Sequence, residues 1–281
     1  MKILYGILIA GVSLSLAGCK IDLGRVMDNI GNVKTAIVGV DEEEEAEIGH
    51  EAAATLLGAS PLLEHEATQR YVNRVGRWVA MQSARPDLPW RFGVIDHPNI
   101  NAFAAPGGYV FITRGLLFQL RNEAELAGVL GHEIAHVVQK HHLEALKKEA
   151  RLNLAGSLAS AALESGGKDA SKYEWVTAGA KTLYTRGLDR DDEFAADRAG
   201  VVLAARAGYD PYGLLVVLQR LDSISADDGR LALLFKTHPA PADRLTELTQ
   251  RMDGRFDALA DARDGAGRFR GQMEGLAAAG F

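Results

Sequence analysis

Cysteine is scarce in this sequence and positive charge is not in excess. The one cysteine, Cys19, has no second cysteine with which to form an internal disulfide. The formal net charge of −6 gives no electrostatic case for nucleic acid as a partner. Long hydrophobic spans are lacking beyond the first residues, and so are repeats of fixed period. With 47% hydrophobic and 24% charged residues, the chain has the composition of one ordinary globular domain with tails.

The N-terminus has the pattern of an export signal. An apolar run at residues 3–16 follows Lys2 and is too short to span a bilayer comfortably, so we expect residues 1–18 to be a removed signal peptide. The run ends in Leu-Ala-Gly-Cys at residues 16–19, which resembles the lipobox of bacterial lipoproteins. This resemblance implies that cleavage leaves Cys19 as the first mature residue and that Cys19 carries a lipid.

The residues after Cys19 indicate the expected cellular location of the protein and the limits of its domain. Lys20 stands where an Asp would favour the inner membrane, so the lipoprotein resemblance implies an anchor at the periplasmic face of the outer membrane. Residues 19–40 mix Gly, Asp, Asn and Val without periodicity, as expected of a lipidated tether. We expect the folded domain at residues 41–253 and a flexible tail at residues 254–281, which are rich in Gly, Ala and Arg.

His132, Glu133 and His136 form an HExxH pattern inside an apolar stretch without proline. The stretch is typical of a buried helix that begins after Asn122. Histidines four residues apart on a helix lie within about 40° of each other, so both imidazoles can hold one ion. Glu133 lies at the flank of the same face, which suits a general base better than a ligand. Because unpaired His and Glu are costly to bury, the pattern predicts a metal site.

A catalytic zinc site needs a third protein ligand, for which two candidates remain. His142 would complete, with His132 and His136, the ligand spacing of the metzincin class of zinc peptidases. That class needs Gly at the position of Gln139. We expect Gln139 instead to continue the helix and turn His142 away. Glu193 is the better candidate. Asp197, four residues further along the same helical face, could accept the free ring N–H of a ligating histidine. An ordinary charged helix edge is the alternative interpretation of these two acids.

The remaining patterns predict an α+β fold that is mainly helical. Residues 90–96 alternate like a strand, and residues 101–113 read as strand, turn and strand beside the HExxH helix. The exposed edge of this small sheet or hairpin could pair with an extended peptide through four residues, Asn101, Ala102, Phe103 and Ala104. A purely structural hairpin is the alternative. Periodicity predicts further helices over residues 46–57, 61–85, 172–186, 188–207, 211–224 and 242–252, and one ending near residue 163.

Four motifs in this order resemble the HtpX and CAAX-prenyl-protease-like family of gluzincin metallopeptidases, most closely its soluble periplasmic lipoprotein branch. They are NAFAAPGG at 101–108, HEIAH at 132–136, EFAAD at 193–197 and THP at 237–239, and the match covers about residues 43–252. The resemblance implies a zincin-like domain with one Zn²⁺ held by His132, His136 and Glu193. It also implies that Glu133 is the base and that Asp197 is a supporting carboxylate.

The resemblance leaves two roles open for His238. In relatives the histidine of this motif lies near the zinc, where it either stabilises the oxyanion or occupies the open coordination position as a self-inhibiting plug. Arg244 could support the same region. A histidine satisfied within a proline-rich loop is the alternative.

These observations together predict a zinc endopeptidase of the bacterial cell envelope. We expect its substrates to be misfolded or unassembled envelope polypeptides, and its contact with the membrane to be the lipid on Cys19. Two alternatives remain. One is a chaperone-like or binding lipoprotein with a plugged zinc site, and the other is a structural lipoprotein in which HExxH is fortuitous.

Overall fold

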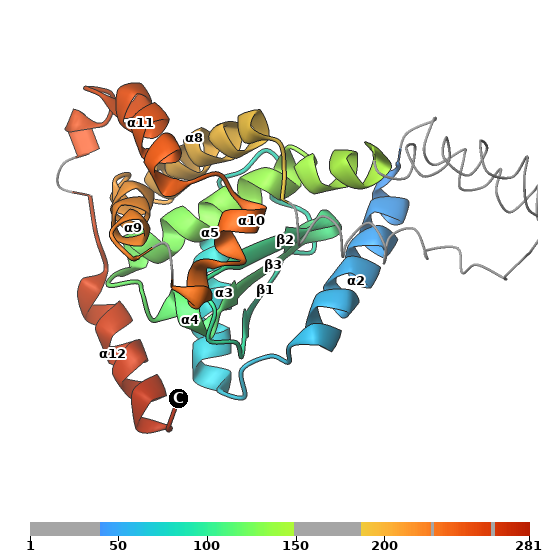
Figure 1. The fold of residues 1–281 in the computed structure, drawn as a ribbon, viewed down its shortest axis with the longest axis horizontal. Helices are drawn as coiled ribbons and strands as arrows, with labels where there is room; N and C mark the ends of the chain where they lie inside the picture. The colour runs from blue at the N-terminus through green and yellow to red at the C-terminus, as the bar shows by residue number, and fades with distance from the viewer. Residues whose placement is uncertain (1–39, 149–186, 226–227, 260–261) are drawn as a thin grey trace, which may run out of the picture.

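The computed structural model describes residues 40–148, 187–225, 228–259 and 262–281 (Figure 1). The predicted signal peptide, the lipidation site Cys19 and all but the last residue of the predicted tether lie outside the described residues. So do the helices expected to end near residue 163 and to span residues 172–186. Within the described part of the chain, no helix is both long enough and apolar enough to cross a lipid bilayer.

Helices and strands are interspersed as far as β3, and every later element of the described chain is helical. In chain order they are α2 (Glu42–Ala59), α3 (Glu66–Ala80), β1 (Arg91–Ile95), β2 (Ala102–Ala105), η1 (Pro106–Gly108), β3 (Tyr109–Thr113), α4 (Arg114–Leu117), α5 (Glu123–Val138), α8 (Arg190–Arg206), α9 (Gly213–Asp222), η2 (Gly229–Leu231), α10 (Leu234–Thr237), α11 (Pro241–Met252), η3 (Asp257–Leu259) and α12 (Ala266–Ala278). The mainly helical α+β prediction is confirmed, and the predicted strand, turn and strand are β2, η1 and β3.

The sheet has three strands in the order β1-β3-β2, with β1 parallel and β2 antiparallel to β3. Gly107 and Gly108 make the tight turn at φ values of 72° and 99°, which glycine adopts without a steric penalty. Side chains alternate between two packed faces. Ala102 and Ala104 belong to the large core under α3 and α5, whereas Phe103 belongs to a smaller core with α2. Strand β2 therefore forms one edge of the sheet, with its side chains buried on both faces.

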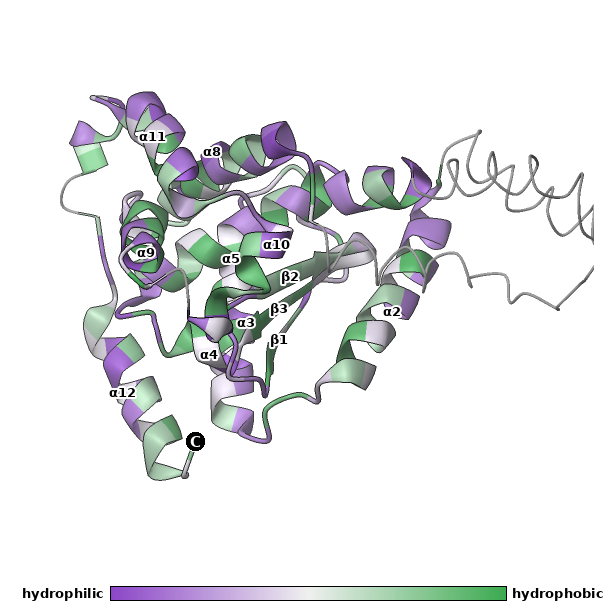
Figure 2. Cartoon of the chain, viewed as in Figure 1, coloured by the Kyte–Doolittle hydropathy of each residue, from purple (hydrophilic) through white to green (hydrophobic). Residues whose placement is uncertain are grey.

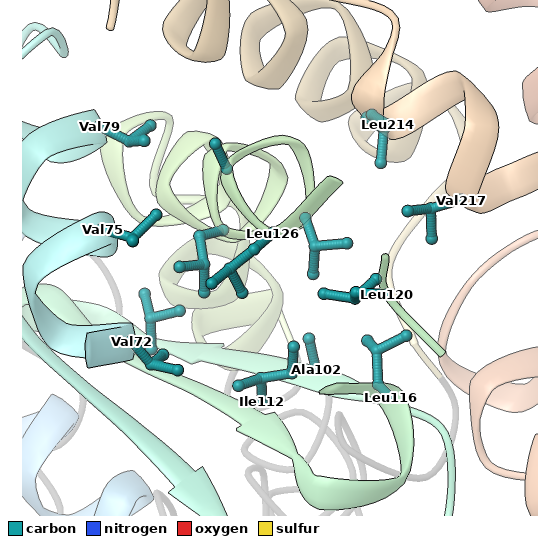
Figure 3. Packing of buried hydrophobic residues seen from close by; sticks show 14 of the residues in the cluster. Val72, Val75, Val79, Ala102, Ile112, Leu116, Leu120, Leu126, Leu214 and Val217 are labelled. Atoms are coloured by element: carbon teal, nitrogen blue, oxygen red, sulfur yellow. The ribbon is translucent and has the colours of Figure 1, made fainter. Parts of the chain in front are cut away.

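Helix α5 runs through the centre of the molecule (Figure 1). Its N-cap is Asn122, whose side chain accepts a hydrogen bond from the Glu125 N–H at 2.8 Å, so the predicted start of the helix is confirmed. Every residue from Glu123 to Val137 is buried. Figure 3 shows Leu126 of this helix between Val75 and Val79 of α3 on one side and Leu214 of α9 on the other. The polar residues of α5 must therefore find partners inside the protein.

Helix α8 crosses α5 at a contact between two glycines. A Cβ added to Gly131 would lie 2.7 Å from the carbonyl oxygen of Gly200, closer than real side chains approach. The two backbones therefore touch. This contact brings Glu193 and Asp197 of α8 alongside the HExxH face of α5.

The end of α5 differs from the prediction, because the helix stops at Val138 and Gln139 is its C-cap. Lys140 then takes a left-handed conformation with φ of 60°, which is uncommon for a residue other than glycine. Its Nζ lies 2.9 Å from Oε2 of the buried Glu45 on α2. Arg85 also donates to both oxygens of Glu45, at 2.7 and 3.1 Å. This long-range ion pair fixes the turn, so a local helix pattern could not predict it.

The C-terminal residues also differ from the flexible tail expected at 254–281. Helix α12 packs on α3 and α5, with Phe269 2% exposed and Leu276 fully buried. Arg268 donates through Nε to the buried Glu123 at the start of α5, at 2.8 Å. Figure 2 shows hydrophilic and hydrophobic residues mixed along α12. The domain therefore extends beyond residue 253, because two apolar residues seven apart and one ion pair are enough to dock this helix.

We predict that Phe269→Ala lowers the free energy of unfolding by about 3–5 kcal/mol, because a buried aromatic ring is replaced by a cavity. Urea denaturation followed by circular dichroism measures the change. Phe281→Ala is the matched control, since this ring near the same helix is 36% exposed and should cost much less. Equal midpoints for the two variants would contradict the docking of α12.

Candidate metal centre

His132 and His136 lie one turn apart on α5 and point the same ring nitrogen at the same space. Their Nε2 atoms are 3.0 Å apart and their ring centroids 4.6 Å apart. His132 is 3% exposed and His136 is fully buried. The spacing of the HExxH pattern therefore produces the paired imidazoles that it predicts.

Glu193 reaches the same space from α8. Its Oε2 lies 3.5 Å from His132 Nε2, and its Oε1 lies 3.5 Å from His136 Nε2. Glu193 is fully buried, and Oε1 has no hydrogen-bond partner among the described residues. A buried carboxylate oxygen without a donor is costly unless a cation satisfies it. Two imidazoles and one carboxylate are also a donor set that zinc prefers, so the residues fit this ion.

His238 is the fourth member of the group. It follows the short helix α10, and its Nδ1 lies 2.7 Å from Glu193 Oε2. One ligand atom from each of His132, His136, Glu193 and His238 lies within 4.8 Å of all the others. His142, the other candidate for third ligand, is outside this group, although its ring centroid is 5.2 Å from that of His136.

Asp197 and Arg244 support His132 from behind. Asp197 Oδ1 lies 2.8 Å from His132 Nδ1, and Arg244 donates to both oxygens of Asp197 at 2.9 and 2.5 Å. Burial alone would raise the pKa of Asp197, but Arg244 outweighs it and lowers the pKa to about 2. The carboxylate is therefore ionised and accepts the Nδ1–H of His132, which leaves the lone pair of Nε2 facing the group.

The same carboxylates make the site favourable for positive charge. Burial and Arg244 lower the pKa of His132, but Asp197 and Glu193 outweigh them and raise it to about 9. A site that stabilises a proton in this way also stabilises a metal cation.

Glu133 lies beside the group without belonging to it. It is 2% exposed and lines a cavity of about 30 Å³ together with His132, His238 and Arg244. No hydrogen bond or ion pair holds its carboxylate within the part of the chain that is described. Burial raises the pKa of Glu133, and the charges of His132 and His238 only partly offset this. A buried carboxylate with a raised pKa and no fixed partner is suited to proton transfer.

The predicted substrate strand borders this cavity only in part. Ala102 lines it, but Asn101 is fully buried and donates through Nδ2 to Thr237 Oγ1 at 3.4 Å. Phe103 is 8% exposed and Ala104 fully buried. The side chains of this strand therefore build the core and the cavity wall, and any contact with a peptide would fall to its main chain.

Sequence reasoning missed His141, which lies directly against His136. The two Nδ1 atoms are 3.0 Å apart, and His141 is 9% exposed. Only the pair of histidines after the HExxH pattern signalled this position, and the metzincin spacing favoured His142 of that pair as the candidate.

Asp197→Asn is expected to weaken metal binding about 10- to 100-fold, because the amide no longer neutralises Arg244 or holds the ring of His132 as firmly. Competition with a chromophoric chelator measures the affinity for Zn²⁺. Asp191→Asn, which changes an exposed carboxylate on the same helix, is the control. Equal affinities for both variants would show that Asp197 does not support the metal ligands.

The sequence matches a known protein family over most of its described length. The profile of peptidase family M48 covers residues 66–252. The beta-barrel assembly-enhancing protease of Escherichia coli strain K12 is 28% identical over 255 residues, which are 89% of this chain and 52% of that protein. A Vibrio cholerae protein named as a putative beta-barrel assembly-enhancing protease is 32% identical over 237 residues, which are 80% of this chain and 47% of that protein.

A eukaryotic relative shares the same region. The mitochondrial metalloendopeptidase OMA1 of Schizosaccharomyces pombe is 28% identical over 209 residues, which are 74% of this chain and 60% of that protein. The chain spans about half the length of the bacterial relatives that it matches. The family match and the buried group of two histidines and a glutamate lead to the same conclusion: the chain belongs to the metalloendopeptidases of peptidase family M48.

Proposed function

We propose that this protein is a zinc endopeptidase of the bacterial cell envelope that degrades misfolded or unassembled envelope proteins. The observation that carries the proposal is the arrangement of His132, His136 and Glu193 beside Glu133, a buried carboxylate with no hydrogen-bond or ion-pair partner among the described residues. Three protein ligands with a base at hand are the requirements of a hydrolytic zinc site.

The chemistry divides between the ion and the chain. A bound Zn²⁺ would supply a Lewis acid that polarises a peptide carbonyl and lowers the pKa of water. Glu133 takes the proton from the attacking water and delivers it to the nitrogen of the leaving amine. Asp197 and Arg244 keep His132 in the tautomer whose Nε2 binds the ion. The oxygen of the water becomes the second oxygen of the new carboxylate as the peptide C–N bond breaks, and both protons of the water end on the leaving amine.

The position of the His238 side chain supports a self-inhibited form of this enzyme. Its ring lies at the fourth corner of the group, where a catalytic zinc site needs an open position for water and substrate. Its hydrogen bond to Glu193 Oε2 at 2.7 Å keeps it there. We therefore favour the plug over the oxyanion role for the described arrangement, and His238 has to leave before a substrate binds.

The proposed substrate class is supported by the relatives, and the proposed cellular location is supported by the N-terminal sequence. The name of the bacterial relatives, beta-barrel assembly-enhancing protease, supports envelope polypeptides as substrates. The lipobox-like residues 16–19 support a lipid on Cys19 and a periplasmic location at the outer membrane. Strand β2 is the last strand in the order of the sheet and its Ala102 lines the cavity beside Glu133, which supports a substrate polypeptide placed along this strand.

Glu133→Gln is expected to slow the cleavage of an unfolded outer-membrane protein about 10²- to 10⁴-fold, because the amide cannot take a proton. Gel electrophoresis with mass spectrometry of the fragments follows the reaction. Glu144→Gln, at an exposed carboxylate beyond the end of α5, should cleave as the wild type does. Cleavage that survives both Glu133→Gln and a chelator would remove the metallopeptidase assignment for this substrate.

His238→Ala separates the plug from the oxyanion role. We expect it to raise the rate of peptide hydrolysis several-fold, because the position that His238 occupies becomes open. An oxyanion role predicts the opposite, a loss of about 10²- to 10³-fold. If wild type and variant both bound zinc without cutting any unfolded substrate, but kept it soluble, the chaperone-like alternative would replace the peptidase.

A further inference from the structure

His141 makes a specific contact with the metal-ligand candidate His136. Their Nδ1 atoms are 3.0 Å apart, and their rings meet edge to face, with centroids 5.1 Å apart at 74°. On its other side, His141 Nε2 lies 3.7 Å from the Asp192 carboxylate. His141 is thus a buried ring between a metal ligand and an acid on α8.

The nitrogens of His136 fix the direction of this hydrogen bond. Nε2 faces Nε2 of His132 at 3.0 Å and Oε1 of Glu193 at 3.5 Å, so this nitrogen must offer its lone pair to a shared ion. The ring proton of neutral His136 is then on Nδ1. The hydrogen-bond partner of that Nδ1 is His141 Nδ1, which must be the acceptor. The two ligand histidines therefore have different supports, an ionised Asp197 for His132 and a second imidazole for His136.

The chain is bent to make this contact. On a continuous helix, His141 would lie five residues beyond His136 and about 140° around the axis, facing away from it. The left-handed Lys140, at φ of 60°, breaks the helix and turns the chain back. Such a conformation is sterically unfavourable for a residue with a side chain. The ion pair from Lys140 to the buried Glu45 holds the turn in place.

We propose that His141 is a positioning residue for His136. It accepts the Nδ1–H of that ring and so fixes the tautomer and the orientation in which Nε2 binds the metal. The inference rests on the proposed zinc site and adds the residue that supports the second histidine ligand. Partners of this kind contribute about 10- to 100-fold to metal affinity in other proteins.

Two substitutions at position 141 separate the hydrogen bond from packing. His141→Leu keeps bulk but removes the acceptor, and we expect the dissociation constant for Zn²⁺ to rise about 10- to 100-fold. His141→Asn places an amide oxygen close to the position of Nδ1, and its dissociation constant should stay within a few-fold of the wild type. His142→Leu is the matched control, because His142 is equally buried and its ring is similarly close to His136. Chelator competition on the full chain measures all four proteins, without reference to proteolysis.

The outcomes decide between the inference and the proposed function. A wild-type chain that binds no zinc would overturn both. If the wild type binds zinc, then equal affinity in His141→Leu, or an Asn variant as weak as the Leu variant, would overturn the positioning role and leave the zinc site intact.

A measurement on the unmodified protein covers the case in which a variant does not fold. In the zinc-loaded wild type with ¹⁵N-labelled histidine, we expect the His136 proton on Nδ1 and a nitrogen–nitrogen coupling across the hydrogen bond to His141. A proton on Nε2 of His136, or no coupling between the two rings, would overturn the proposal.

Discussion

Helices α5 and α8 cross with their backbones in contact, and the site depends on that contact. A Cβ on Gly200 would lie 2.6 Å from the His132 amide nitrogen, so any side chain there would push the helices apart. At this separation Glu193 reaches both ligand histidines, and Asp197 reaches the far side of the His132 ring. His132 and His136, which a buried helix would otherwise leave unpaired, thus find their partners across one glycine crossing.

The other buried carboxylates make the unusual state of Glu133 clear. Glu45, Glu123 and Glu125 are each at most 3% exposed, and each is paired with an arginine. Those arginines are Arg85, Arg268 and Arg220, and they come from three different parts of the chain. Two of these pairs hold the start of α5, and Glu45 also pairs with Lys140 just beyond its end, as buried charges require. Glu133 is buried as deeply, but no hydrogen bond or ion pair holds it within the described structure, as its proposed role in proton transfer requires.

Local patterns in the sequence predicted the elements well and their long-range connections poorly. The start of α5 at Asn122, the extent of α8 and the hairpin of β2 and β3 depend on capping, periodicity and turn residues that lie within a few positions. The end of α5 and the docking of α12 depend on Lys140 meeting Glu45 and Arg268 meeting Glu123, which are far apart in the chain. Within the site, the four-residue spacing of His132 and His136 was enough to predict that their rings lie together. The choice of Glu193 needed the order of four motifs, and the contact of His141 needed the unexpected turn.

Under the proposed function, a plugged site and an active peptidase are compatible because the plug is connected to the substrate strand. His238 follows Thr237, whose hydroxyl accepts a hydrogen bond from Asn101 at the start of β2. Ile100, one residue earlier, donates its N–H to the Arg230 carbonyl at 2.9 Å, so the segment between Arg230 and His238 contacts the two residues before β2. A polypeptide that enters the cavity beside Ala102 would lie next to His238, which lines the same cavity. Since α10 is a single turn of helix, moving it breaks few hydrogen bonds, and substrate binding itself can supply the free energy that moves His238 away from Glu193.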